Sequence, residues 1–204
     1  MPAFILPTFP TLRKEPPKGE GWVHEVKFDG YRAQLAKDGK SIVIYSRNGK
    51  DFTSRFESVA QALRGLPCKS AIIDAEIVAC NTQGLPDFEL LHSRKFKQES
   101  LCAWCFDILH YDGKDMRQVP LAVRRMRLSG LIKRTEDDFL RFSEGFDDAA
   151  KLLKQCEKLN MEGIVSKRKD APYRSGKGDW FKVKCTKWTE QNRDRGERLF
   201  GEGR

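Results

Sequence analysis

The sequence predicts an α+β fold, in which mixed and largely antiparallel sheets are flanked by helices. Short runs of β-type residues are joined by Asp-Gly turns, and segments with helical spacing of apolar residues alternate with those runs. The 204 residues are also enough to bury the core of one large domain. Several links between strands are too short for a helical crossover, so antiparallel neighbours should predominate.

Residues 1–21 are predicted to form an irregular N-terminal lead-in. Four prolines and two glycines fall between residues 7 and 21, and they interrupt regular structure. No basic residue precedes the short apolar run at its start, so it does not resemble a secretory signal. Ordered structure is therefore expected to begin near Trp22.

Three short strands are predicted next, at residues 22–27, 31–37 and 41–46. Asp29-Gly30 and Asp38-Gly39 are placed to make the turns between them. A helix is predicted over 55–66 because its apolar residues recur every three or four positions. The remaining elements are predicted strands at 71–80, 101–110, 163–167 and 180–184, and predicted helices at 87–94, 121–132 and 146–159.

Composition restricts the class of protein. An apolar content of 39% with 33% charged residues is typical of a globular chain, and no apolar run is long enough to span a bilayer. We therefore expect a cytoplasmic protein without a membrane partner. The six cysteines are scattered, so they are expected to be free thiols, with the Cys102-x-x-Cys105 pair in the core rather than in a zinc site.

Positive charge is concentrated near the C-terminal end. The net charge is +9, and residues 167–187 contain eight basic side chains against two acidic ones. Such a cluster is typical of a site for nucleic acid or nucleotide phosphate, although charge alone favours a solvated surface equally.

One motif contains the candidate catalytic residues. The common phosphate-binding loops, Gly-x-x-x-x-Gly-Lys-Ser/Thr and Gly-x-Gly-x-x-Gly, are both missing from the sequence. The run Lys27-Phe28-Asp29-Gly30-Tyr31-Arg32 instead fits Lys-x-Asp-Gly-x-Arg, which would arise by chance in roughly a few chains per thousand of this length.

The run from Glu25 to Arg32 resembles the signature of covalent nucleotidyltransferases, and most closely that of bacterial ATP-dependent DNA ligases of the end-joining type. Further blocks follow in that family's order at residues 46–49, 74–78, 106–109, 162–167 and 180–184. The resemblance implies an ATP-grasp-like nucleotidyltransferase, or adenylation, domain over residues 22–187, with 188–204 as a polar tail.

The resemblance makes Lys27 the nucleophile that takes up AMP from ATP. A lysine amine attacks phosphorus only when it is unprotonated, and nearby cations with partial burial lower an amine's pKa. Lys182 and Lys184 alternate with Val183, so both are expected on one strand face, where they would hold the α-phosphate. The alternative is that they lie on a solvated strand face.

Glu76 and Glu162 are the predicted metal-binding residues. Each lies on or beside an apolar strand, where a lone carboxylate is costly without a partner. Mg²⁺ prefers oxygen ligands and retains waters, so the two carboxylates are expected to hold it near the triphosphate. Ion pairing with nearby lysines is the alternative.

The resemblance assigns further nucleotide contacts. It makes Phe106 the platform on which adenine stacks, and it places Glu25 and Lys167 among the residues that seat the nucleotide. It directs Arg32 and Arg47 toward the ribose or the 5′-phosphate of a nick, for which a planar guanidinium is well suited. Gly30 is expected to permit a turn.

The predicted function is three-step DNA strand joining. Lys27 forms lysyl-AMP, AMP passes to a DNA 5′-phosphate, and the neighbouring 3′-hydroxyl displaces AMP. The partner is nicked or broken double-stranded DNA, which implies a nucleoid-associated monomer. The twenty residues after Lys184 are too few for an OB-fold barrel, so we expect that domain, or end-joining repair proteins, in trans.

Two alternatives stay open. An RNA ligase or a capping guanylyltransferase shares the lysine motif and the fold type. A nucleotide- or DNA-binding module without catalysis would bind its ligand, with salt-sensitive binding in the case of DNA, and would form no covalent intermediate.

Overall fold

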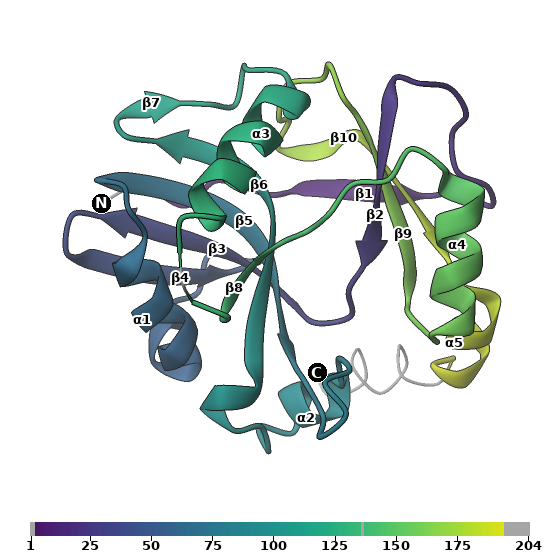
Figure 1. Ribbon diagram of the computed structural model, residues 1–204, viewed down its shortest axis with the longest axis horizontal. Coiled ribbons are helices and arrows are strands. Elements are labelled where there is room, and N and C mark those ends of the chain that lie inside the picture. The colour runs from purple at the N-terminus through teal and green to yellow at the C-terminus, as the bar shows by residue number, and fades with distance from the viewer. Residues whose placement is uncertain (1–2, 136, 194–204) are drawn as a thin grey trace.

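The computed structural model describes residues 3–135 and 137–193, and it contains two β-sheets that face each other across a cleft (Figure 1). Helices cover the outer side of each sheet. Most strand pairs are antiparallel, with parallel pairing only for β1 with β10 and β6 with β8 among the described strands. The predicted α+β class is confirmed.

The larger sheet is built from the middle of the chain. Its strands, in spatial order, are β4 (Ser41–Ser46), β3 (Tyr31–Asp38), β5 (Ser70–Ala79), β6 (Leu101–Tyr111) and β7 (Lys114–Asp115), with β8 (Leu140–Phe142) beside β6. Nine of the ten residues of β5 are buried, as expected for a central strand covered on both faces.

Helices α1 (Glu57–Gly65) and α3 (Leu121–Ile132) pack on the larger sheet (Figure 1). A 3₁₀ turn, Thr53–Phe56, leads into α1, and Phe56 is fully buried in the core. The short helix α2 (Phe88–His92) is in the segment that connects β5 to β6 along the chain. The Asp87 side chain caps it by accepting hydrogen bonds from the backbone N–H groups of Glu89 and Leu90.

The smaller sheet joins the two ends of the chain. Its order is β1 (Thr8–Leu12), β10 (Gly176–Lys184), β9 (Gly163–Arg168) and β2 (Trp22–Lys27). Helix α4 (Ala149–Lys158) packs on β9 and β2, and α5 (Thr186–Gln191) packs on α4. These two helices lie on the side of the sheet away from the cleft (Figure 1).

The N-terminal lead-in is irregular only in part, and regular structure begins before Trp22, because Thr8–Leu12 forms strand β1 while residues 13–21 contain no helix or strand. Polar bonds anchor it. The buried Thr8 donates its N–H to the Tyr173 hydroxyl at 3.1 Å and its Oγ to the Arg174 carbonyl at 2.5 Å, and its own carbonyl accepts from Arg32. An amphipathic pattern does not reveal such an anchor.

Three boundaries also differ from the predictions. The helix expected from residue 146 begins at Ala149, because Asp148 is its N-cap and accepts the Lys151 N–H at 2.9 Å. Strand β10 begins at Gly176 rather than at 180. The predicted tail begins inside helix α5, and residues 194–204 lie outside the described residues.

Along the described chain, no helix is long and apolar enough to cross a membrane. The six cysteines are all free, and Cys102 and Cys105 are buried, as the sequence predicts.

Candidate active site

A cavity of about 600 Å³ lies in the cleft between the two sheets. Strands from both sheets line it, and so does the segment that joins β2 to β3. Nine of the ten predicted site residues line this cavity: Glu25, Lys27, Arg32, Arg47, Glu76, Phe106, Glu162, Lys167 and Lys182. A second cavity, of about 1010 Å³, lies between residues 15–19 and α4 and contains none of them.

Lys27 is the last residue of β2, and its side chain points at a carboxylate. Its Nζ lies 2.5 Å from Oε2 of Glu162, and the Lys27 side chain is 20% exposed. In the strand register Lys27 stands opposite Gly163 of β9. A Cβ on Gly163 would lie 2.0 Å from the Val183 carbonyl oxygen, so only glycine lets β9 and β10 meet at this point.

Gly30 follows strand β2 in the chain, and its role differs from the expected one. Its φ is not in the left-handed region, so no turn requires glycine there. A Cβ at this position would lie 2.2 Å from the carbonyl oxygen of Ile77. Gly30 is therefore needed because the loop after Lys27 passes directly against β5.

The basic strand β10 contributes two lysines near Glu162. Lys182 lines the cavity, and burial followed by the charges of Lys27 and Lys184 lowers its pKa. Lys184 does not line the cavity, but its Nζ lies 3.4 Å from Oε1 of Glu162 and 4.7 Å from the ring centre of Trp188. Glu162 is thus held between the amines of Lys27 and Lys184.

Glu76 lies across the cavity on β5, and its carboxyl group binds its proton unusually tightly. Burial raises the pKa of Glu76 to about 7, with Glu162 and Asp29 acting in the same direction and Lys27 and Arg32 opposing them. A positive charge placed beside this carboxylate would offset its desolvation. The described residues contain no cluster of three or more acidic, histidine or cysteine ligands.

Replacing Glu76 with glutamine is expected to stabilise the nucleotide-free protein above pH 7 by roughly 1–2 kcal/mol. The carboxyl pKa is about 7 in the folded protein against an ordinary 4.5, so the folded state holds the proton while the unfolded state has lost it. This contribution to stability is complete below pH 4.5 and is lost as the pH rises through 7.

Urea unfolding of both proteins at about pH 5 and about pH 8 measures the effect. The stability difference should grow in favour of Glu76→Gln at the higher pH. A difference that is the same at both pH values would contradict the assigned ionisation.

Arg32 directs all three of its donor nitrogens at protein groups. Its Nε and Nη2 donate to Asp74 at 3.0 and 2.6 Å, and its Nη1 donates to the Thr8 carbonyl. The Tyr173 hydroxyl donates to the same Asp74 carboxylate at 2.7 Å. The sequence points to Arg32 but gives no sign of this buried network.

Arg47 is exposed at the turn after β4 and points over an aromatic ring. Its guanidinium carbon lies 4.6 Å from the ring centre of Phe9 on β1. Phe9 and Pro10 therefore form one wall of the cavity. Both fall in the segment that the sequence predicts to be irregular.

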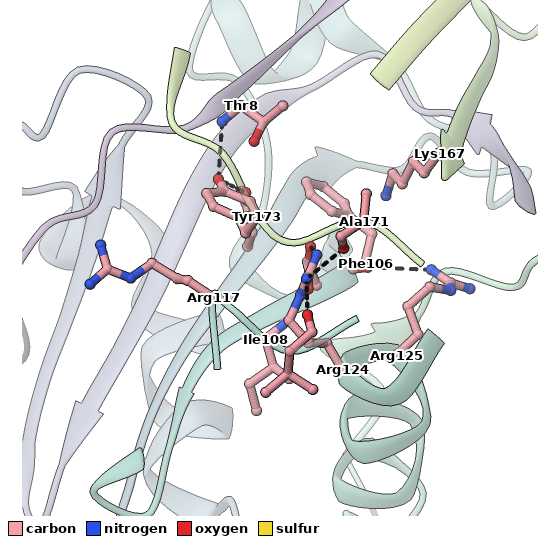
Figure 2. Close-up of polar contacts among 12 residues, drawn as sticks. Thr8, Phe106, Ile108, Arg117, Arg124, Arg125, Lys167, Ala171 and Tyr173 are labelled. Carbon is pink, nitrogen blue, oxygen red and sulfur yellow. Dashed lines mark hydrogen bonds and ion pairs between the residues drawn. The ribbon is translucent and has the colours of Figure 1, made fainter. Parts of the chain in front are cut away.

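Phe106 and Lys167 meet deep in the cleft (Figure 2). The Nζ of Lys167 lies 4.3 Å from the ring centres of both Phe106 and Trp180, which contact each other edge to face. Lys167 is 2% exposed, and burial lowers its pKa. Val165 also lines this part of the cavity, on β9.

Glu25 binds two cations at the same end of the cavity. Its Oε1 lies 2.8 Å from Lys167 Nζ and 2.7 Å from Arg125 Nη1, and its Oε2 accepts from the Ser143 hydroxyl at 2.9 Å. No sequence motif identifies Arg125 or Ser143. The sequence does contain one sign of buried arginines in α3, because Arg124 and Arg125 interrupt the apolar face of this helix at core positions.

Comparison with known proteins points to one family. Residues 10–184 match the family described as "ATP dependent DNA ligase domain". The chain is 36% identical over 189 residues to the multifunctional non-homologous end joining protein LigD of Pseudomonas aeruginosa, covering 91% of this chain and 22% of that protein. It is 34% identical to a DNA ligase of Pyrobaculum islandicum, covering 81% and 31%.

Solved structures give the same fold. The ligase domain of LigD from M. tuberculosis superposes with a TM-score of 0.73 at 25% identity, covering 88% of this chain and 60% of that one. The ATP-dependent DNA ligase of bacteriophage T7, in complex with ATP, has a TM-score of 0.58 at 17% identity, covering 80% and 62%. The chain spans about a fifth to a third of the length of these two curated relatives.

Proposed function

Because the chain belongs to the ATP-dependent DNA ligase domain family, we propose that it is an adenylation domain in which Lys27 accepts AMP from ATP. One observation carries the proposal. Lys27 Nζ points into the cavity, 2.5 Å from Glu162, among nearly all the residues that the sequence marks as nucleotide contacts.

In the first step the unprotonated Nζ of Lys27 attacks the α-phosphorus of ATP. A phosphorus–nitrogen bond forms, the bond from the α-phosphorus to the bridging oxygen breaks, pyrophosphate leaves, and the nitrogen gives up its extra proton to the Glu162 carboxylate beside it. Glu162 Oε2 accepts a hydrogen bond from the attacking amine and so directs it. Lys182, at the cavity wall, offsets the negative charge that grows on the α-phosphate oxygens.

The adenine base is proposed to stack on Phe106, with Val165 facing it from β9. Glu25 then lies at the edge of the base, because Lys167 contacts both the Glu25 carboxylate and the Phe106 ring. Arg47, which lines the cavity and is exposed, is proposed to meet a phosphate or ribose.

Glu76 and Glu162 fit a magnesium ion that keeps several waters. One or two carboxylates with substrate phosphates are the usual ligands for Mg²⁺, and the raised pKa of Glu76 indicates a carboxylate that a nearby cation would stabilise. When bound, the ion would neutralise part of the charge of the triphosphate.

The later steps are proposed from the family. AMP passes to the 5′-phosphate of nicked or broken double-stranded DNA, and the adjacent 3′-hydroxyl displaces it. The basic residues between 167 and 187 support a polyanionic substrate, and such a substrate would place the protein at the nucleoid. Further domains of a ligase, or end-joining proteins, would complete the DNA contacts.

The test is intact-mass measurement after incubation with ATP and Mg²⁺, with GTP as the parallel reaction. We expect a gain of one AMP from ATP and no gain from GTP. Lysyl-GMP in place of lysyl-AMP would support a guanylyltransferase. No adduct with either nucleotide would overturn the proposal.

A chase separates the nucleic acid substrates. Radiolabelled lysyl-AMP protein is mixed with nicked DNA or with nicked RNA of the same sequence. Transfer of the label to the 5′-phosphate of DNA is expected, whereas transfer to RNA alone would make the protein an RNA ligase.

A further inference from the structure

Arg125 lies behind the cavity, on α3, and does not line it. Its guanidinium contacts three different segments of the chain. Nη1 lies 2.7 Å from Glu25 Oε1 on β2 and donates to the backbone carbonyl of Phe106 on β6 at 3.3 Å. Nη2 donates to the Ser143 carbonyl at 2.7 Å, after β8 (Figure 2 shows the contact with Phe106).

The surroundings leave this guanidinium little freedom. Arg125 is 7% exposed, and its guanidinium carbon lies 4.7 Å from the ring centre of Phe142. A Cβ on Gly145 would come within 3.1 Å of Nη2, so the segment after β8 is closely packed against it. The rigid fork of an arginine is suited to hold several acceptors at fixed angles, which a lysine ammonium cannot do.

Two cations share one oxygen of Glu25. Lys167 and Arg125 both lie within 2.8 Å of Oε1, and Lys167 also faces the Phe106 ring. Lys167 reaches its position from the flexible end of a four-carbon chain, whereas Arg125 is fixed by two backbone carbonyls. Arg125 therefore sets the distance between the Glu25 carboxylate and the backbone of the aromatic platform.

That distance matters for the choice of base. If a purine stacked on Phe106 has its six-position edge toward Glu25, that edge meets a carboxylate, which accepts hydrogen bonds and cannot donate them. An amino group at that position is a donor, whereas a keto oxygen would face the carboxylate as a second acceptor. Polar sites of this kind discriminate strongly only when the acceptor is held in place.

We propose that Arg125 is a positioning residue that makes the site selective for 6-aminopurine nucleotides, through its hold on Glu25 and on the Phe106 backbone. The inference rests on the proposed function, since it concerns the nucleotide from which lysyl-AMP is made. Arg125 itself contacts neither base nor phosphate.

The experiment compares ATP with inosine triphosphate, which carries a keto group in place of the amine. Rates of covalent adduct formation are measured over a range of each nucleotide for the wild type, Arg125→Lys and Arg127→Ala. Arg127 is the matched control, because it lies on the exposed face of the same helix. Ser143→Ala is a milder variant that removes only the hydroxyl bond to Glu25 Oε2.

For Arg125→Lys we expect a KM for ATP raised about tenfold, kcat within about twofold of the wild type, and an ATP preference over inosine triphosphate reduced about tenfold or more. Ser143→Ala should shift the preference in the same direction by a smaller factor. Arg127→Ala should match the wild type.

Two results would overturn this inference but not the proposed function. The first is a wild type that uses both nucleotides equally. The second is a loss of kcat in the Arg125 and Ser143 variants with the wild-type preference for ATP unchanged. A wild type that forms no adduct with ATP would overturn the proposed function, and this inference with it.

Discussion

Lys27→Arg is expected to abolish covalent AMP transfer, with a rate reduced by about 10⁴-fold or more. Arginine keeps the positive charge and can still pair with Glu162, so the fold and the local charge should survive. A guanidinium stays protonated at any working pH and has no lone pair available to attack phosphorus. The variant therefore removes the nucleophile and little else.

Intact mass and peptide mapping after incubation with ATP and Mg²⁺ measure this effect. Lys40→Arg is the control, because Lys40 is exposed in the turn between β3 and β4 and should leave the adduct unchanged. An adduct of normal yield in Lys27→Arg, mapped to a peptide that contains Lys182, would assign the nucleophile to the wrong lysine.

Arg124→Leu is expected to lower the free energy of unfolding by about 3–5 kcal/mol. Arg124 and Asp107 form a fully buried pair, in which Nε and Nη2 donate to the carboxylate at 2.7 and 2.8 Å. Arg124 also donates to the Val119 and Ala171 carbonyls. Leucine would leave the Asp107 charge buried without its cation.

Urea unfolding gives the measurement, and the chain offers a matched control. Arg117 forms a similar two-point pair with Asp115 at the surface, where both side chains are roughly half exposed. Arg117→Leu should cost only about 0–1 kcal/mol. Equal losses in the two variants would show that burial does not decide the strength of these pairs.

A double replacement separates the pair from its surroundings. Arg124→Leu combined with Asp107→Leu removes both charges, so it should recover much of the stability that Arg124→Leu loses. No recovery would mean that the bonds of Arg124 to Val119 and Ala171 carry most of the effect.

Local sequence patterns predicted the elements whose stability comes from apolar burial. Strands β2 to β6 and helix α3 lie within a residue or two of their predicted limits, because apolar runs, alternation or helical spacing mark them in the sequence. Strand β1 was missed because a buried threonine and the Tyr173 hydroxyl hold it, and those residues are far apart in sequence.

The residues of the site also differ in how far the sequence could predict them. The side chains to which we assign chemistry lie in contiguous motifs, so the sequence alone could single out Lys27, Glu76 and Glu162, which line one cavity. Their partners could not, since Arg125 reaches Glu25 from a helix a hundred residues later in the chain. The sequence also could not predict why position 30 requires glycine, because the requirement depends on how closely the loop passes β5.

The connectivity of the two sheets has a consequence for how the molecule folds. The five strands β3 to β7 of the larger sheet lie within residues 31–115, so they can pair as soon as that part of the chain has left the ribosome. The smaller sheet pairs β2 with β9 and β1 with β10, which closes loops of well over a hundred residues. We therefore expect the nucleotide cleft to be the last region to assemble, on a half that is already folded.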